Sequence, residues 1–154
     1  MADLEVLDDI TEQYIVVRLG GEEFGIGIGY VDNIIRIQSI TRVPTAQFYF
    51  KGVINLRGEV VPVMSIRKKM GLEDDEMTDK SRIIILKLED HELIGIIVDA
   101  VSEVVNLSNS SIEAQRKDSS SGVEDTYISG IGKAGSRLIS IFDINAIIED
   151  KETA

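Results

Sequence analysis

The side chains that most often carry out catalysis are scarce in this sequence. His91 is the only histidine in 154 residues, and the chain contains no cysteine. The lack of cysteine excludes a thiolate nucleophile, a Cys-ligated zinc site and a disulfide. A serine nucleophile would be expected in a Gly-x-Ser-x-Gly elbow, and no such motif occurs. We interpret His91, which lies between Asp90 and Glu92, as an exposed turn residue.

Carboxylates form one dense cluster of potential metal ligands. Residues 73–76 read Glu-Asp-Asp-Glu, and Asp79 follows. A calcium loop needs alternating ligands, a central glycine and a terminal bidentate glutamate, and this run differs from that pattern. Adjacent carboxylates are typical of a solvated linker. The alternative hypothesis is an acidic cation-binding protein or a metal-dependent hydrolase, which a calcium or magnesium titration would test.

Two glycine-rich segments invite comparison with phosphate-binding loops. Residues 25–29 lack the third spaced glycine of a dinucleotide loop, and residues 130–134 lack the Walker spacing and the Ser/Thr after lysine. We expect bulges or close packing points at both places. The sequence therefore predicts a protein that is not an enzyme and has no metal or cofactor.

The charge balance narrows the class of partner. The formal net charge is −11, and a surface of this sign repels phosphate backbones and anionic lipid. We therefore expect no nucleic-acid partner and no direct membrane binding; a nucleic-acid-binding barrel is a second competing hypothesis, which lacks its basic face. No signal peptide is visible in the acidic N-terminal residues, so we expect a cytoplasmic protein.

Residues 50–66 have the pattern of a β-hairpin. Two β-branched runs flank Arg57 and Gly58, as in two strands joined by a tight turn. Gly58 can adopt a positive φ without steric cost, which places Arg57 at the turn tip in solvent. Pro62 cannot donate a ladder hydrogen bond and so predicts an edge or a bulge in the outgoing strand.

Local patterns predict the remaining elements. We expect strands at residues 14–19, 23–28 and 37–43, a helical turn at residues 30–35, a short helix at residues 65–70, a polar connector at residues 72–80 and a final helix through Ile148 that Asp143 caps.

The first half of this pattern recurs in the second half. Residues 22–37 match residues 92–107 at an offset of seventy, and residues 52–66 match residues 130–144 at an offset of seventy-eight. The extra length falls in the Ser-rich residues 108–124. Two copies with about five short strands each predict a mainly-β fold of two small barrels that share an apolar contact.

The repeat also predicts the organisation of the chain as one domain with two barrel subdomains. We expect a flexible acidic tail at residues 1–12, one β-barrel at residues 13–80 and a second at residues 81–150. The sequence leaves open whether the first strand stays in the first barrel or crosses to the second.

The hairpin also carries a family resemblance. Residues 50–63, FKGVINLRGEVVPV, together with EFGI at residues 23–26, resemble the CheW family, the coupling proteins of bacterial chemotaxis. The resemblance covers residues 14–148. It implies two five-stranded SH3-like barrels packed side by side, an architecture that the internal repeat supports separately.

The resemblance further implies a non-enzymatic adaptor with two protein partners. One partner would be the cytoplasmic hairpin tip of methyl-accepting chemoreceptors. The other would be the C-terminal regulatory domain of the histidine kinase CheA. Such an adaptor would be recruited from the cytoplasm to membrane-associated receptor arrays.

Positions that match the family pattern supply the candidate contact residues. The receptor-binding candidates are Val31, Asn33, Gly52, Arg57, Gly58 and Ile83, and the weaker kinase-binding candidates are Gly130, Gly132, Lys133 and Gly135. Asn33 departs from the family, whose members often carry glutamate there. From physics alone, Val31 and Ile83 fit core packing as well as a groove between the barrels.

Arg57 has an internal comparison in the second copy. The matching turn, residues 133–136, keeps its glycine and lacks an arginine, so the turn forms without a guanidinium. Arg57 is therefore either an idle surface residue or a contact residue, since arginine is enriched among residues that dominate interfaces. The resemblance favours the contact.

Overall fold

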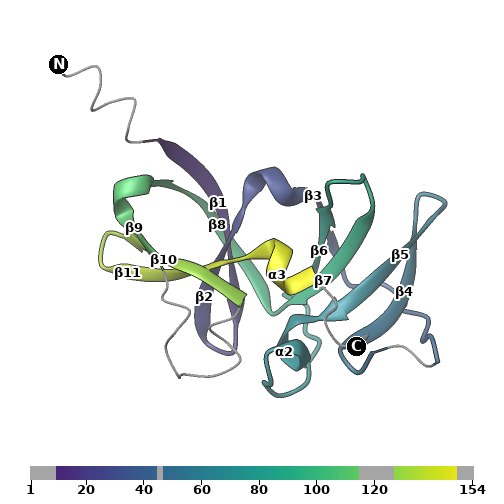
Figure 1. Cartoon of the computed structure of the whole chain (residues 1–154). Helices are drawn as coiled ribbons and strands as arrows, with labels where there is room; N and C mark the ends of the chain where they lie inside the picture. The colour runs from purple at the N-terminus through teal and green to yellow at the C-terminus, as the bar shows by residue number, and fades with distance from the viewer. Residues whose placement is uncertain (1–9, 45–46, 115–126, 149–154) are drawn as a thin grey trace.

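The computed structural model of the chain describes residues 10–44, 47–114 and 127–148. Within these residues, eleven strands form two sheets that lie side by side (Figure 1). The strands are β1 (Thr11–Leu19), β2 (Glu22–Gly27), β3 (Val31–Arg36), β4 (Phe50–Leu56), β5 (Glu59–Ser65), β6 (Arg82–Lys87), β7 (Leu93–Val98), β8 (Ala100–Ser108), β9 (Ile112–Ala114), β10 (Ile128–Ala134) and β11 (Arg137–Phe142). The helices are η1 (Ile28–Tyr30), α2 (Ile66–Lys69), η2 (Asn109–Ser111) and α3 (Ile144–Ile148).

The two sheets have the same internal order. Sheet A runs β8-β1-β2-β11-β10-β9, and sheet B runs β3-β6-β7-β5-β4. Strands β8, β1, β2, β11 and β10 of sheet A correspond by the sequence repeat to β3, β6, β7, β5 and β4 of sheet B. The expected mainly-β fold with two SH3-like units is confirmed.

The boundary expected between residues 13–80 and 81–150 does not separate these sheets. Strands β1 and β2 precede it but pair with β8 and β11, while β6 and β7 follow it but pair with β3 and β5. The two copies have thus exchanged their first hairpins, and the first strand crosses to the second copy. The hairpins have the same hydrophobic pattern, so the local sequence does not specify which sheet each one joins.

A glycine marks the place where each exchanged hairpin docks. Ile141 of β11 pairs with Gly25 in parallel, and Val63 of β5 pairs with Gly95 in the same way. A Cβ atom at Gly25 would lie 3.0 Å from Ile141 Cδ1, and one at Gly95 would lie 3.3 Å from Val63 Cγ2. At both places the strands can approach closely only because glycine has no side chain, as expected for glycine in a strand.

Three apolar clusters form the core. The largest joins sheet A, sheet B, α2 and α3, while the other two lie within one sheet each. Residues 83–86 of β6 are all buried because Ile84 and Leu86 face the shared cluster and Ile83 and Ile85 face the interior of sheet B. Coverage on both faces explains why this strand reads as a continuous hydrophobic run.

Several local expectations are confirmed and others are wrong. Ser65 Oγ accepts from Lys68 N at the start of α2, and Asp143 Oδ1 accepts from Ala146 N at the start of α3. The helical turn expected at residues 30–35 is instead strand β3, because its backbone pairs with β6 and its alternate side chains are partly buried. The strand expected at residues 37–43 reduces to a single bridge between Thr41 and Val53.

The ends of the expected segments lie partly outside the described residues. Of the expected tail at residues 1–12, residues 1–9 lie outside, and β1 begins at Thr11. Of the Ser-rich segment, residues 115–124 lie outside, and η2 and β9 occupy its first part.

Candidate functional site

The turn between β4 and β5 places Arg57 at the end of sheet B. Arg57 has φ of 52° and Gly58 has φ of 84°, as in the type I′ turn that two-residue hairpins favour. Asn55 Oδ1 accepts a hydrogen bond of 3.0 Å from Gly58 N and so fixes the turn. The Arg57 side chain is 71% exposed, as the sequence predicted, but its left-handed backbone was not foreseen.

Arg57 also connects the hairpin tip to the far edge of sheet B. Its Nη2 lies 3.9 Å from Asp32 Oδ2 on β3, and Gln38 Nε2 donates to Asn55 O at 3.1 Å. Strands β3 and β4 are the two edges of the sheet. These contacts bring the edges together, which curls the sheet towards a barrel.

The equivalent turn in sheet A avoids the unfavourable backbone. Gly135 occupies the place of Arg57 between paired residues Ala134 and Arg137, and its φ is 66°. Glycine adopts this region freely, whereas other L-residues adopt it at a cost. The first copy therefore retains a strained arginine where the fold itself favours glycine, and such strain commonly marks functional positions.

Two candidate glycines, Gly52 and Gly130, are buried scaffold positions. A Cβ at Gly52, whose φ is 142°, would lie 2.1 Å from Thr41 O. A Cβ at the repeat-related Gly130 would lie 2.8 Å from Glu113 O. Each glycine follows a register shift in its strand and lets a crossing segment approach.

The remaining receptor-binding candidates also belong to sheet B. Ile83 is 0% exposed within the interior of the sheet, so it supports the site without reaching solvent. Val31 is half-buried against the shared cluster, and Asn33 Oδ1 accepts from Ile34 N at 2.8 Å. Val31 and Asn33 flank Asp32, the ion-pair partner of Arg57, along β3, and their side chains lie on the opposite face of the strand from Asp32, while Gly52 and Ile83 are buried.

The kinase-binding candidates all lie on or next to β10 in sheet A. Gly132 is buried, and a Cβ there would lie 2.6 Å from Leu107 Cδ1. Lys133 points outward with a 57% exposed side chain, and its Nζ lies 3.6 Å from Glu113 Oε2. The two candidate sets therefore occupy different sheets.

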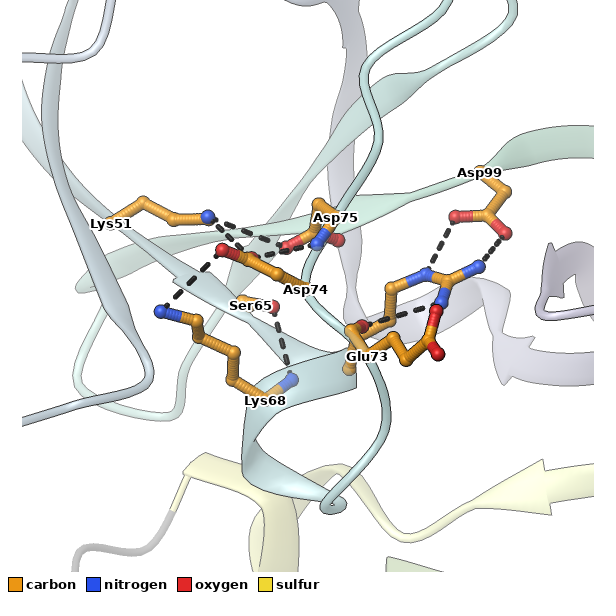
Figure 2. A network of polar contacts seen from close by, with 8 residues as sticks. Lys51, Ser65, Lys68, Glu73, Asp74, Asp75 and Asp99 are labelled. Carbon is orange, nitrogen blue, oxygen red and sulfur yellow. Dashed lines mark hydrogen bonds and ion pairs between the residues drawn. The ribbon is translucent and has the colours of Figure 1, made fainter.

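A polar network surrounds α2 and reaches Asp99, which lies between β7 of sheet B and β8 of sheet A (Figure 2). Arg67 of α2 donates from Nε and Nη2 to the Asp99 carboxylate at 3.0 and 2.5 Å. Asp99 Oδ2 also accepts from Gly20 N in the β1–β2 turn at 2.9 Å. Burial alone would raise the pKa of Asp99, but the hydrogen bonds from Arg67 and Gly20 lower it below its ordinary value.

The acidic connector after α2 is held by lysines. Lys51 Nζ donates to Asp74 Oδ1 at 2.6 Å and lowers the pKa of Asp74, and Lys68 Nζ lies 3.6 Å from Asp74 Oδ2. Asp75 is buried, with its side chain 2% exposed and its Oδ2 3.9 Å from Lys51 Nζ. Within the described residues its oxygens accept no hydrogen bond of good geometry, and burial raises its pKa.

The geometry gives the acidic cluster a structural use. Within residues 10–44, 47–114 and 127–148, no three Asp, Glu or His side chains come together as metal ligands.

No helix in this part of the chain is long and apolar enough to cross a membrane. His91 lies in an exposed turn with φ of 68°, as the sequence indicated.

Sequence reasoning missed the partners of the arginines. Asp32 and Asp99 lie 25 and 32 residues from Arg57 and Arg67, and no local pattern links them. Arg137 likewise donates to Glu23 at 3.0 and 2.9 Å and pairs with Glu103, which joins β11 to β2 and β8. These four carboxylates could be matched to their arginines only once the strand order was known.

The fold and these surfaces define the class of protein. Residues 13–152 match the model of the CheW-like domain, and the chain belongs to this family. It is 40% identical over 146 residues to the chemotaxis protein CheW of Bacillus subtilis (strain 168), covering 93% of this chain and 90% of that protein. It is 32% identical to the CheW of Thermotoga maritima, covering 96% and 95%.

A solved structure agrees with this assignment. The crystal structure of a scaffolding protein CheW from Thermoanaerobacter tengcongensis matches with a TM-score of 0.82 and 30% identity, covering 92% of this chain and 95% of that one. Membership of the family makes this chain a chemotaxis scaffold, or adaptor, protein.

Proposed function

We propose that this scaffold couples the cytoplasmic tip of chemoreceptors to the C-terminal regulatory domain of the kinase CheA, without catalysis of its own. Coupling requires only that two partners are held in fixed geometry, so that a shift in one changes the equilibrium of the other. The proposal places the chain in membrane-associated receptor arrays through these protein contacts.

The strained Arg57 is the observation that carries the proposal. Its guanidinium is exposed at the end of sheet B. Its backbone has a positive φ, which glycine adopts in the equivalent turn between β10 and β11. Among the described residues, the one polar contact that the fold gains from the guanidinium is a long, exposed ion pair with Asp32, whereas a binding partner could use the whole group. Gly58 follows Arg57 in the turn, and Val31 and Asn33 flank its ion-pair partner Asp32 along β3; Gly52 and Ile83 are buried positions of the same sheet.

The separation of the two candidate sets supports a two-partner scaffold. The receptor-binding set belongs to sheet B, and Lys133 and Gly135 lie on a hairpin of sheet A. A shared apolar core joins the sheets, so the two surfaces keep a fixed relation. We assign the sheet A hairpin to the kinase.

Calorimetric binding to each partner separately tests this assignment. Arg57→Ala should weaken binding of a cytoplasmic receptor fragment by about 1–3 kcal/mol, typical of interface anchors. It should leave binding of the CheA regulatory domain unchanged. Lys133→Ala, the matched variant at the other exposed hairpin, should do the reverse, and both complexes should form without added metal or nucleotide.

The melting temperature decides between a contact role and a structural role. Arg57→Ala keeps the left-handed strain, so its melting temperature should equal that of the parent chain. Equal losses of stability and of binding to both partners would contradict the proposal.

A further inference from the structure

A second surface of sheet B combines exposed apolar side chains with positive charge. A groove of about 670 Å³ lies between the segment that follows β3 and the connector after α2. Three of the large hydrophobic residues exposed in the described chain line it, namely Val43, Phe48 and Met77, with exposures of 46, 61 and 43%. This groove includes none of the candidate receptor or kinase contacts.

The cationic rim of this groove contrasts with the rest of the molecule. Arg42, Lys51 and Lys68 line it together with a single carboxylate, Asp74, on a chain whose net charge is −11. Asp74 already pairs with both lysines, an arrangement that Figure 2 shows. Arg42 has no ion pair with any other described residue, so its charge is available to a ligand.

We propose that this groove is a docking site for an acidic amphipathic segment of a partner protein. Such a segment has an aromatic or aliphatic side chain flanked by carboxylates. The apolar side chain would lie between Phe48 and Met77, and a carboxylate would pair with Arg42 as a charge-assisted hydrogen bond. An aromatic anchor with a charged neighbour is the usual composition of an interface hot spot.

The shape of the surface and the net charge favour a protein segment over a lipid surface. A groove buries an inserted side chain on two sides, whereas a bilayer needs a protruding face. The negative charge of the chain opposes approach to anionic lipid. Charge complementarity at Arg42 then selects acidic peptides over basic ones.

A phage-displayed library of random 12-residue peptides, panned against the full chain, tests this inference. Phage that also bind the Phe48→Ser variant are removed. The enriched peptides should combine Asp or Glu with aromatic or aliphatic residues. A synthetic enriched peptide should bind Phe48→Ser and Arg42→Glu about tenfold or more weakly than the parent chain.

Matched controls keep the result interpretable. Val104→Ser removes a 50% exposed aliphatic side chain from sheet A and should bind the peptide as the parent does. Thermal unfolding should show that all variants are folded, and the charge change at Arg42 provides a second test if Phe48→Ser is destabilised. The proposal is overturned if no peptide survives the subtraction, if the enriched peptides are basic, or if anionic phospholipid vesicles bind through Arg42 while peptides do not.

Discussion

Arg57 and Asp75 are two residues whose local environments oppose stability. Arg57 adopts a positive φ, whereas the repeat-related position in sheet A is a glycine, Gly135. Asp75 has a buried carboxylate beside Lys51. Both residues cost the folded state free energy for a local reason. A substitution at each should therefore stabilise the chain, which is unusual for single changes.

Arg57→Gly separates stability from binding. Glycine relieves the left-handed strain, so the free energy of unfolding should rise by about 0.5–1 kcal/mol, while receptor binding falls as much as in Arg57→Ala. Urea denaturation and calorimetry on the same samples measure the two effects. A loss of stability would show that the arginine side chain supports the fold through Asp32.

Asp75→Asn should stabilise the chain at neutral pH. Because burial raises the pKa of Asp75 in the folded state, the unfolded chain releases this proton at lower pH and stability falls as the pH rises through the folded pKa. The asparagine side chain does not ionise, so the variant does not lose stability in this way. The gain in melting temperature should be present at pH 7 and should vanish below about pH 4, near the ordinary pKa of aspartate. A gain that persists in acid would exclude this cause.

At the scale of elements, the glycines at register shifts allow the strands to cross. Gly52 and Gly130 occupy repeat-related places in β4 and β10, and at each a backbone oxygen fills the space of a side chain. These buried glycines would affect a binding partner only indirectly, because they determine the shape of the strands that carry the exposed residues.

Gly52→Ala should destabilise the fold by about 2–4 kcal/mol, because the new methyl group would overlap Thr41 O in a backbone conformation that alanine rarely adopts. Gly29→Ala is the matched control, since a Cβ there meets no atom within 4 Å, and it should change stability by less than about 0.5 kcal/mol. Urea titrations of both variants make the comparison. Equal effects would mean that the Thr41 bridge is easily displaced.

Much at this scale could be predicted from the sequence, for identifiable reasons. The β4–β5 turn, the short helix after β5, the Asp143 cap and the repeat depend on neighbouring residues, and all were visible in the sequence. Strand β3 was mistaken for a helical turn because apolar and polar residues do not alternate regularly along it. Only its pairing with β6 shows that it is a strand. Pro62 predicted an edge or a bulge, but β5 is interior; Pro62 stands just before the stretch that pairs with β7.

The residues of the candidate site also fall into those that the sequence could identify and those that it could not. Arg57 was identifiable because the repeat supplied a comparison, and its exposure follows from the turn. Asp32 was not, because the curvature of a whole sheet brings it to the hairpin tip. Gly52 and Ile83 matched the family pattern by position, but only the packing shows that both are buried.

At the scale of the molecule, Arg67 connects the two sheets. Its pair with Asp99 is partly buried, with side-chain exposures of 15 and 29%, and Asp99 also accepts from the β1–β2 turn of sheet A. The orientation of one proposed binding surface relative to the other depends on this contact as well as on the shared core.

Arg67→Met should destabilise the chain by about 1–3 kcal/mol, because it leaves Asp99 charged without its main partner. Since Asp99 has a lowered pKa in the parent chain, its contribution is present above the ordinary aspartate pKa and is lost as the pH falls through the folded value. The difference between variant and parent should therefore shrink below about pH 4. Lys87→Met, at the exposed end of β6, serves as the control, and an unfolding gap that ignores pH would contradict the assignment.

The exchange of first hairpins between the two repeat copies sets an order on synthesis at the ribosome. Sheet B is complete once Val98 has emerged, since its strands span Val31 to Val98. Strands β1 and β2 emerge before these strands, and β1 finds its partner β8 soon after sheet B is complete. In contrast β11, the other partner of β2, is translated more than a hundred residues after β2. The β2 side of the N-terminal hairpin must therefore wait unpaired until β11 has emerged, and a nascent chain stalled before β10 would present it to chaperones.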